Sequence, residues 1–343
     1  MPRKTITPPP MRIIDPTAVE KPWEPTSYTP VDAKEAETME QMPDTQDEIV
    51  LHHTPPPTSP PPEFATGSFE LFRGSGHLHD VPNPDDVPVG GAEHGRALGQ
   101  LMPPGTETPD YVEHPTASIR DQGRSEECVA FTFARHINAR LALLLLKDPD
   151  AIIWPSTTGI YGLARGDDAK DADGNFAIDG GCFPRLAALG MMLHGVVADA
   201  RLPFDMATVN AALPWDVITA GYDAKVLKFH VIEPAYGRET EFIDELERTI
   251  ASGYTVPFAQ PIDRPFNDYT SGVLGAVSGP TRGSHYTLIR GYDKKRKVFL
   301  CDNSWSESWG KNGRYEMSYD RVLSRDCSNY VVLTTIPDAR NIR

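Results

Sequence analysis

Residues 121–131 of the chain are Asp121-Gln122-Gly123-Arg124-Ser125-Glu126-Glu127-Cys128-Val129-Ala130-Phe131. From here on, apolar side chains recur at helical spacing with polar ones between them: Ala130, Phe131, Ala134, Ile137, Leu141, Leu144 and Leu145. This spacing indicates an α-helix with a buried face and a polar stripe. Gln122-Gly123 ends a loop, so the sequence predicts that Cys128 lies where a loop becomes a buried helix.

A cysteine at the start of a helix is a candidate nucleophile. The thiolate is the reactive form, and both a helix N-terminus and a nearby imidazolium lower the thiol pKa from its ordinary ~8.5. The alternative is a small buried cysteine with a purely structural role, which is the commoner situation for an isolated cysteine. The rest of the sequence decides between the two.

Two downstream stretches carry a histidine and an asparagine. They are Gly283-Ser284-His285-Tyr286-Thr287-Leu288-Ile289-Arg290-Gly291-Tyr292 and Asp302-Asn303-Ser304-Trp305-Ser306-Glu307-Ser308-Trp309-Gly310-Lys311-Asn312-Gly313. With the stretch around Cys128, and in this order, they resemble the three signature segments of the papain family of cysteine peptidases. Tyr111-Val112 resembles the mature start of that family, so the resemblance covers residues 111–336.

The resemblance implies a role for each of these residues. Cys128 is the expected nucleophile, His285 its base and Asn303 the residue that orients the imidazole. Gln122 is expected to donate its amide to the oxyanion, and Trp305 to shield the His–Asn bond from water. The implied reaction is hydrolysis of a peptide bond in a peptide or protein substrate, without a cofactor.

A glycine pair is expected to bind the substrate. Asp179-Gly180-Gly181, followed by a helix from Pro184, resembles the family segment whose backbone pairs with an extended substrate. Glycine suits such a position because a Cβ blocks the approach of another backbone. A Gly-Gly turn that binds no ligand is the alternative.

The order of the elements predicts an α+β fold with antiparallel strands. Helices are expected at 128–145, 184–193 and 239–252, and strands follow at 254–258, 285–291, 297–302 and 314–318. The resemblance implies a papain-like fold of two subdomains, a helical left half and a twisted antiparallel right half, with the active cleft between them.

Three departures from the family pattern bear on activity. Ser125 and Ile178 stand where the family has a disulfide, which agrees with a reducing compartment and with an intracellular bacterial or viral-type branch. Val129 replaces the usual tryptophan after the nucleophile. Glu126 and Glu127 replace small residues, and their negative charge is expected to raise the thiol pKa and to weaken activity.

Residues 1–110 are expected to form an extended or disordered arm ahead of a domain at 111–336, with a short C-terminal tail at 337–343. About two-thirds of the 33 prolines precede Tyr111, and proline-rich sequence buries too little surface to offset its ordering entropy. About 18 acidic residues against about seven basic ones in this arm account for most of the net charge of −15. Nucleic acid is therefore an unexpected partner.

Two further hypotheses concern the arm. In one, the domain is a weakly active or inactive structural protein, for instance of a virion, and the arm docks on an assembly partner. In the other, the arm is an atypical propeptide in the cleft. The N-terminus lacks the apolar run of a signal peptide, and the longest apolar run, 141–146, is too short to span a bilayer. The expected location is a reducing compartment, the cytoplasm or a virion.

No metal site is expected. Asp168, Asp171, Asp173 and Gly174 hint at a calcium loop, but the loop register places Ala169 and Gly180 at ligand positions, so a solvated acidic loop is favoured. His77, His79 and His94 show no pattern of partners, and Cys182, Cys301 and Cys327 are expected to be free thiols.

Overall fold

The computed structural model of the protein describes residues 77–78, 102, 106–166, 168, 170–234 and 237–343. All of them belong to one compact unit, Ser68–Arg343. Most of the arm predicted for residues 1–110 lies outside the described residues, so its predicted structure stays a prediction.

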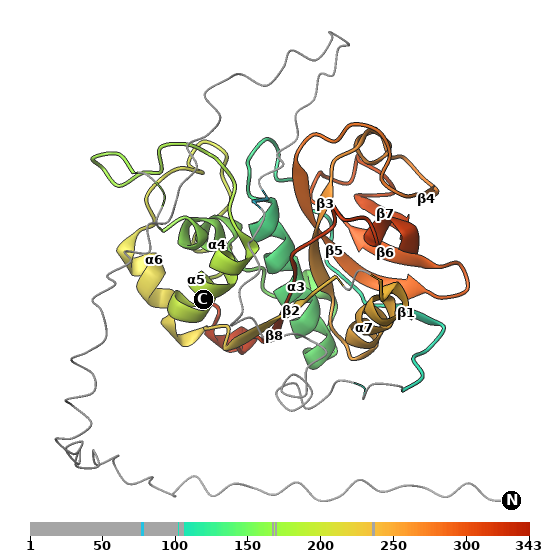
Figure 1. The fold of residues 1–343 in the computed structure, drawn as a ribbon. Coiled ribbons are helices and arrows are strands. Elements are labelled where there is room, and N and C mark those ends of the chain that lie inside the picture. Colours follow the sequence, from blue (N-terminus) through green and yellow to red (C-terminus); the bar gives the residue numbers. More distant parts are fainter. Residues whose placement is uncertain (1–76, 79–101, 103–105, 167, 169, 235–236) are drawn as a thin grey trace, which may run out of the picture. The chain divides into compact units, whose positions relative to one another are not determined.

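One part of the unit is helical (Figure 1). It contains α3 (Cys128–Leu145), α4 (Thr157–Ala164), α5 (Pro184–His194) and α6 (Trp215–Ala220), with the 3-10 turns η1 (Pro149–Ala151) and η2 (Gly221–Asp223). The helices predicted from Cys128 and from Pro184 are both confirmed. The second ends at Gly195, whose φ of 79° and close approach to Gly221 exclude a side chain: a Cβ there would lie 1.8 Å from the Gly221 carbonyl oxygen.

The other part is built on β-sheet. Strands run in the order β1 (Tyr111–Glu113), β5 (Ser284–Asp293), β6 (Val298–Asp302), β7 (Arg314–Ser318) and β4 (Val273–Leu274), and β3 (Val256–Pro261) also pairs with β5. A separate pair joins β2 (Lys228–Ile232) to β8 (Tyr330–Thr335). All pairs are antiparallel except β4 with β7, so the α+β prediction is confirmed and its antiparallel pairing holds for every pair but one.

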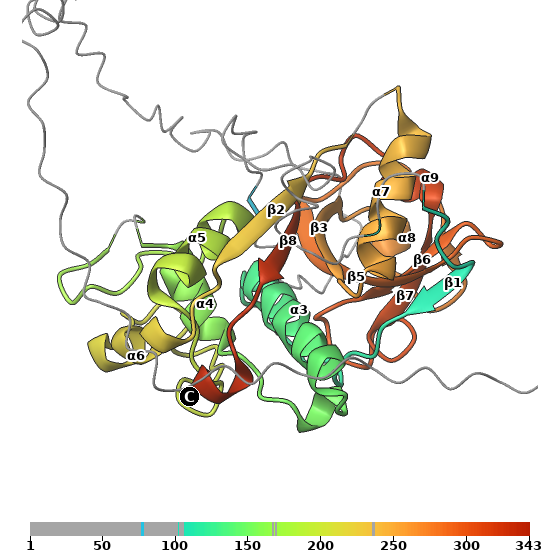
Figure 2. The same cartoon turned by 90° about the horizontal axis from the view of Figure 1, so that it is seen from below.

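Three helices accompany the strands. They are α7 (Glu239–Ala251), α8 (Arg264–Asn267) and α9 (Tyr319–Val322). Figure 2 shows α7 and α8 on one side of the sheet and the long helix α3 running past its other side. The predicted helix over 239–252 is confirmed, with Ser252 as its C-cap.

The sequence pattern misplaced or missed several elements. The strand predicted at 254–258 begins two residues later, at Val256, and extends to Pro261. Strand β8 was missed because nearly all of its residues are buried, so the alternation that marks a half-exposed strand is absent. The predicted C-terminal tail, 337–343, contains the 3-10 turn η3 (Ala339–Asn341) and the buried Ile342.

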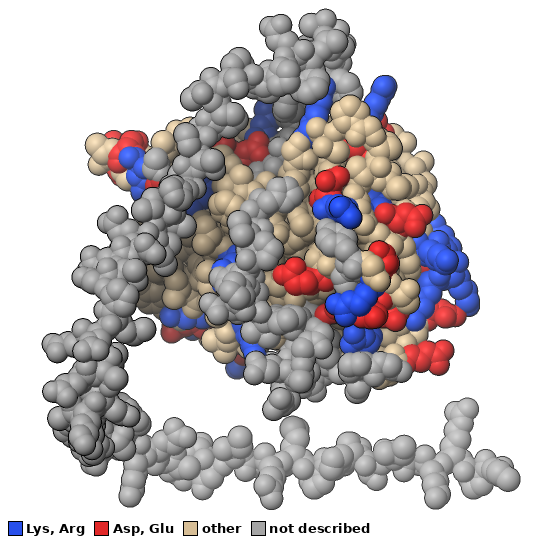
Figure 3. Space-filling view, viewed as in Figure 1, with Lys and Arg blue, Asp and Glu red and all other residues tan. Residues whose placement is uncertain are grey.

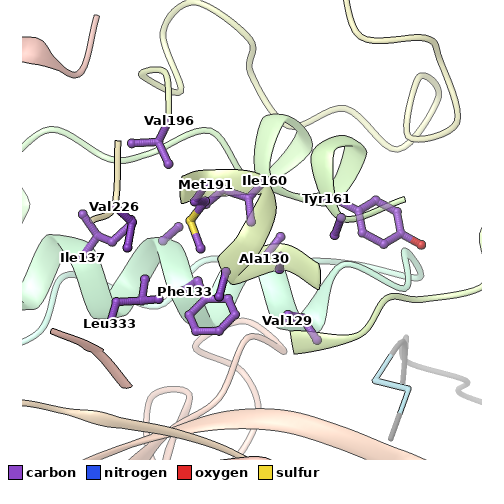
Figure 4. Packing of buried hydrophobic residues seen from close by; sticks show 14 of the residues in the cluster. Val129, Ala130, Phe133, Ile137, Ile160, Tyr161, Met191, Val196, Val226 and Leu333 are labelled. Atoms are coloured by element: carbon purple, nitrogen blue, oxygen red, sulfur yellow. The ribbon is translucent and has the colours of Figure 1, made fainter. Parts of the chain in front are cut away.

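Two hydrophobic clusters hold the unit together. One surrounds α3: Val129, Ala130, Phe133 and Ile137 pack against Ile160 and Tyr161 of α4 and Met191 of α5 (Figure 4). The other fills the space between the sheet and α7. Helix α3 is long and apolar enough to cross a membrane, but 83% of it is buried within the unit, as in the core helix of a soluble protein.

Charged side chains of both signs lie close together over the sheet part (Figure 3). Several form ion pairs, among them Arg290 with Glu113 and Lys295 with Asp110. The 337–343 segment is tied to the helical part, because the Ala198 N–H donates to the Arg343 carbonyl oxygen at 3.1 Å.

A buried ion pair joins α9 to Asp263, the N-cap residue of α8. The Arg321 guanidinium donates to both Asp263 carboxylate oxygens, at 2.9 and 3.1 Å, and both side chains are fully buried. The same guanidinium donates to Gln260 Oε1 at 3.0 Å and to the Pro261 carbonyl at 3.2 Å. The guanidinium therefore also ties α9 to β3, the strand that pairs with β5, and β5 carries His285.

We predict that Arg321→Ala destabilises the full chain by about 3–5 kcal/mol, because the change leaves the Asp263 charge buried and unpaired. The measurement is the free energy of unfolding in urea. Arg264→Ala is the matched control, since its pair with Asp268 is exposed (79% and 50% of the side chains) and is expected to matter little. Equal losses of stability in the two variants would contradict the conclusion that burial makes the Arg321–Asp263 pair important.

Candidate active site

The structure brings His285 and Asn303 into direct contact. His285 lies near the start of β5 and Asn303 directly follows β6, and His285 Nε2 is 2.7 Å from Asn303 Oδ1. Asn303 Oδ1 also accepts the Ser304 backbone N–H at 2.7 Å, which identifies this atom as the acceptor. His285 therefore carries its proton on Nε2, and a neutral ring keeps a lone pair on Nδ1. Nδ1 is buried and has no hydrogen-bond partner in the described part of the chain.

Aromatic rings enclose this pair. Trp305 stacks on the His285 ring at a centroid distance of 4.6 Å, and Phe266 lies 6.0 Å from it. Burial lowers the pKa of His285 to about 4, with the Asn303 hydrogen bond acting in the opposite direction. The imidazole is therefore neutral at pH 7, the state in which it can accept a proton.

Cys128 is the first residue of α3 and is fully buried. The helix is fastened to β5 beside His285, because the Thr132 hydroxyl donates to the Tyr286 carbonyl at 3.0 Å. Burial strongly raises the pKa of the Cys128 thiol; a hydrogen bond with the Tyr286 backbone opposes this shift, and the charge of Glu126 adds to it. Cys128 is thus a neutral thiol in this structure.

The expectation that the charges of both Glu126 and Glu127 raise the thiol pKa is wrong for Glu127. Its side chain is fully buried, and burial raises the pKa of its carboxyl to about 8, with the Thr157 hydroxyl opposing the shift and the charge of Asp179 adding to it. Its carboxyl is largely protonated at pH 7. Of the two glutamates before the nucleophile, only Glu126 contributes a charge that raises the thiol pKa.

Gln122 links the nucleophile loop to the asparagine loop. Its backbone N–H donates to the Ser304 carbonyl at 2.9 Å, and its Oε1 accepts the Ser304 hydroxyl at 2.5 Å. Its Nε2 donates to the Ser125 carbonyl at 2.7 Å, which uses one of the two amide N–H groups. Ser125, at the position of a family disulfide cysteine, donates its hydroxyl to the Gln122 carbonyl at 2.9 Å.

The Gly180-Gly181 segment lies next to the nucleophile segment. Asp179 Oδ2 accepts the Glu126 backbone N–H at 3.0 Å, and its Oδ1 accepts the Tyr161 hydroxyl at 2.5 Å. Gly181 has a φ of 82°, and its N–H donates to the Tyr161 oxygen at 3.0 Å. The Asp179 and Tyr161 side chains together therefore hold the glycine pair against the start of α3.

The contacts of His77 were not foreseen from the sequence. No pattern of partners for His77 is visible in the sequence, but residue 77 forms a parallel β-bridge with Cys182, and its ring contacts Ser284, Tyr286 and Asn329. No local motif foretells such contacts, because they join positions more than 200 residues apart. His79 and His94 lie outside the described residues.

The other sequence candidates take structural roles. Asp171 caps a tight turn by accepting the backbone N–H groups of Asp173 and Asn175, both at 2.9 Å. Among the described residues no cluster of His, Cys, Asp and Glu has the geometry to hold a metal ion. All four cysteines are free and buried.

A helical part packed on a sheet part, with a cysteine at a helix N-terminus and a His–Asn pair on the sheet, defines a papain-like arrangement. Residues 176–334 match the family model described as papain family cysteine protease, and this stretch carries His285 and Asn303. Over this stretch the chain is therefore similar to the papain family of cysteine proteases.

Similar proteins include viral, amoebal and animal sequences. An uncharacterized peptidase C1-like protein of Acanthamoeba polyphaga mimivirus is 23% identical over 154 residues, which is 42% of this chain and 49% of that protein. The gamete and mating-type specific protein A of Dictyostelium discoideum is 24% identical over 215 residues, 61% of this chain and 41% of that protein. The alignments thus span less than half the length of these two relatives. A cathepsin B-like cysteine proteinase of Caenorhabditis elegans is 23% identical over 64% of this chain and 70% of that protein.

Solved structures show the same fold. Xylellain, a cysteine protease from Xylella fastidiosa, superimposes with a TM-score of 0.61 at 18% identity and covers 79% of this chain and 100% of that chain. Procathepsin B of Trypanosoma congolense superimposes with a TM-score of 0.56 at 15% identity, covering 78% of this chain and 87% of that one. The predicted papain-like α+β fold is confirmed.

We predict that Glu127→Gln changes how stability depends on pH. The carboxyl pKa rises from 4.5 to about 8 on folding, so its contribution to stability is fully present below pH 4.5 and is lost as the pH rises through 8. Glutamine cannot ionise. The free energy of unfolding of the variant therefore rises relative to that of the wild type between pH 5 and pH 8, by at most about 1.4 kcal/mol per pH unit. Urea unfolding at several pH values measures this gain.

Glu126→Gln is the control for this experiment, because its side chain is only partly buried. Its effect on unfolding is expected to be small at every pH. A Glu127→Gln difference that stays constant from pH 5 to pH 8 would show that the Glu127 carboxyl is ionised in the folded chain.

Proposed function

We propose that the chain is a cysteine peptidase in which Cys128 is the nucleophile, His285 the base, Asn303 the residue that orients the base, and Gln122 an oxyanion donor. The observation that carries the proposal is the 2.7 Å bond from His285 Nε2 to Asn303 Oδ1 beneath Trp305. It fixes a neutral imidazole whose Nδ1 is the basic atom, on the strand against which the Cys128 helix packs.

The geometry supports a two-step hydrolysis. His285 Nδ1 takes the Cys128 proton as the sulfur attacks the peptide carbonyl, and the oxyanion is stabilised by the Cys128 backbone N–H and the Gln122 amide. The imidazolium then protonates the leaving amine, and an acyl-enzyme forms. A water molecule then attacks this thioester while His285 takes a proton from the water. That proton passes to the sulfur as the acid product leaves.

Asn303 acts throughout as the acceptor of the Nε2 proton. Because its Oδ1 is also fixed by the Ser304 N–H, the imidazole cannot rotate without breaking a buried bond. Trp305 keeps water from competing for that bond. Gly180 and Gly181 are the proposed contacts for the substrate backbone.

The resting site favours a second candidate function as well. Cys128 and His285 are both fully buried and both uncharged at neutral pH, so the nucleophile is silent until the site opens. A weakly active or inactive structural protein, with residues 1–110 as a docking arm, fits this observation. We further propose a peptidase domain at 111–336 and a reducing location, cytoplasm or virion, which four free thiols support.

We predict that Cys128→Ala abolishes both peptide hydrolysis and covalent labelling. The full chain is incubated with a peptide mixture and, separately, with an epoxide inhibitor of the kind selective for papain-like enzymes, and both are read by mass spectrometry. The wild type is expected to gain one adduct on Cys128. Cys327→Ala is the matched control, because Cys327 is equally buried but its thiol donates to the Arg321 carbonyl, and this variant is expected to keep both hydrolysis and labelling.

Hydrolysis that survives Cys128→Ala would overturn the proposed nucleophile. A folded wild type that shows neither labelling nor hydrolysis after prolonged incubation would overturn the proposed peptidase and leave the structural candidate.

A further inference from the structure

A short segment of the chain lies against the loop that follows the glycine pair. His77 forms a parallel β-bridge with Cys182, and the Leu78 N–H donates to the Cys182 carbonyl at 3.1 Å. His77 is only 5% exposed. Its backbone is therefore held as an added strand would be, and its side chain is almost completely enclosed.

Three residues surround the His77 ring, and we name them the imidazole clamp: Ser284, Tyr286 and Asn329. Ser284 Oγ is 3.0 Å from His77 Nδ1, and Asn329 Nδ2 is 2.8 Å from His77 Nε2. The Tyr286 ring stacks on the imidazole at 5.5 Å with an interplanar angle of 12°. Both ring nitrogens and one ring face are thus contacted by separate side chains.

The clamp fixes which ring nitrogen of His77 donates a hydrogen bond and which accepts one. The Ser284 hydroxyl donates to the Gln260 carbonyl at 3.2 Å, so its oxygen is left to accept the proton of His77 Nδ1. The Asn329 amide nitrogen donates to Nε2, which must carry the lone pair. The Tyr286 hydroxyl donates to the Asn329 carbonyl at 2.9 Å and so holds Asn329, whose φ is 53°, in place.

This arrangement selects a neutral imidazole over other rings and over aliphatic side chains. Phenylalanine can stack on Tyr286, but it can neither donate to the Ser284 oxygen nor accept from the Asn329 amide nitrogen, so both hydrogen bonds of the ring are lost. An aliphatic side chain loses the stacking as well.

The clamp adjoins the proposed catalytic residues. Ser284 and Tyr286 are the neighbours of His285 on β5, and the Tyr286 backbone contacts the Cys128 thiol. Cys182, which pairs with His77, directly follows Gly181. A peptide bound as His77 is bound therefore contacts two residues adjacent to His285 in β5, one of which contacts the Cys128 thiol through its backbone.

We propose that the imidazole clamp is a recognition site for a histidine side chain in an extended peptide, and that His77 fills it in this chain and closes the site beside Cys128. The ligand class is a peptide whose histidine backbone pairs with Cys182. That this ligand is also a substrate class rests on the proposed peptidase function, whereas the binding itself does not.

The test uses the full chain with His77→Ala, which vacates the clamp. A fluorescent peptide with the sequence of residues 74–80 is titrated in, along with two versions that carry alanine or phenylalanine in place of the residue-77 histidine. Fluorescence anisotropy is expected to show at least about ten-fold tighter binding of the histidine peptide, since 1.4 kcal/mol corresponds to a factor of ten. The wild type, whose clamp is filled, is expected to bind it far more weakly.

Adding Ser284→Ala to His77→Ala is expected to remove the preference for histidine over phenylalanine. Equal binding of the three peptides to His77→Ala, or equally tight binding by the wild type, would overturn the proposal.

A second readout on the otherwise intact chain covers the case in which His77→Ala does not fold. Ser284→Ala alone is expected to speed alkylation of Cys128 by iodoacetamide several-fold, because it loosens the segment that closes the site. His194→Ala is the control, because His194 ends α5 and its ring stacks on Tyr222, and it is expected to leave the rate unchanged. An unchanged rate in Ser284→Ala would contradict closure by His77.

The outcomes separate this proposal from the peptidase proposal. Selective binding of the histidine peptide without hydrolysis of any peptide would support the clamp and overturn the peptidase. Hydrolysis that depends on Cys128, with no preference for histidine in binding, would overturn the clamp and leave the peptidase standing.

Discussion

The hydrogen bond between His285 Nε2 and Asn303 Oδ1 is the interaction on which the rest of the site depends. It fixes the tautomer of the imidazole and therefore decides which ring nitrogen can act as a base. The bond is buried under Trp305, and the loop that provides Asn303 also provides Ser304, which binds Gln122 through both its hydroxyl and its backbone carbonyl. One loop thus sets the positions of His285, the proposed base, and of Gln122, the proposed oxyanion donor.

Burial controls the charge states of Cys128, Glu127 and His285. It raises the pKa of the Cys128 thiol, raises that of the Glu127 carboxyl to about 8 and lowers that of His285 to about 4, so all three are largely uncharged at neutral pH. An active thiolate–imidazolium pair needs a more polar surrounding than this. The segment containing His77 and Leu78 lies against Cys182, Ser284 and Tyr286, and its proposed role is to close the site.

The sequence predicted the helices from Cys128, Pro184 and Glu239 and most of the sheet, because each has a clear period or a strong stop such as Gly195. It missed β8, whose fully buried residues carry no alternation. The His–Asn contact was expected from a family resemblance and not from spacing, since 18 residues separate the two. The neutral state of Glu127 and the partners of His77 were beyond prediction, because both arise from burial by residues distant in the sequence.

The most direct test of the account is the protonation state of His285 in the folded full chain, measured by ¹⁵N NMR of histidine-labelled protein with His285→Gln to assign the signals. The account predicts a neutral ring with its proton on Nε2 from pH 7 down to about pH 4, and loss of this fixed tautomer in Asn303→Ala. An imidazolium at pH 6, or a ring whose proton is on Nδ1, would contradict it, because Asn303 would then not be holding His285 as the base.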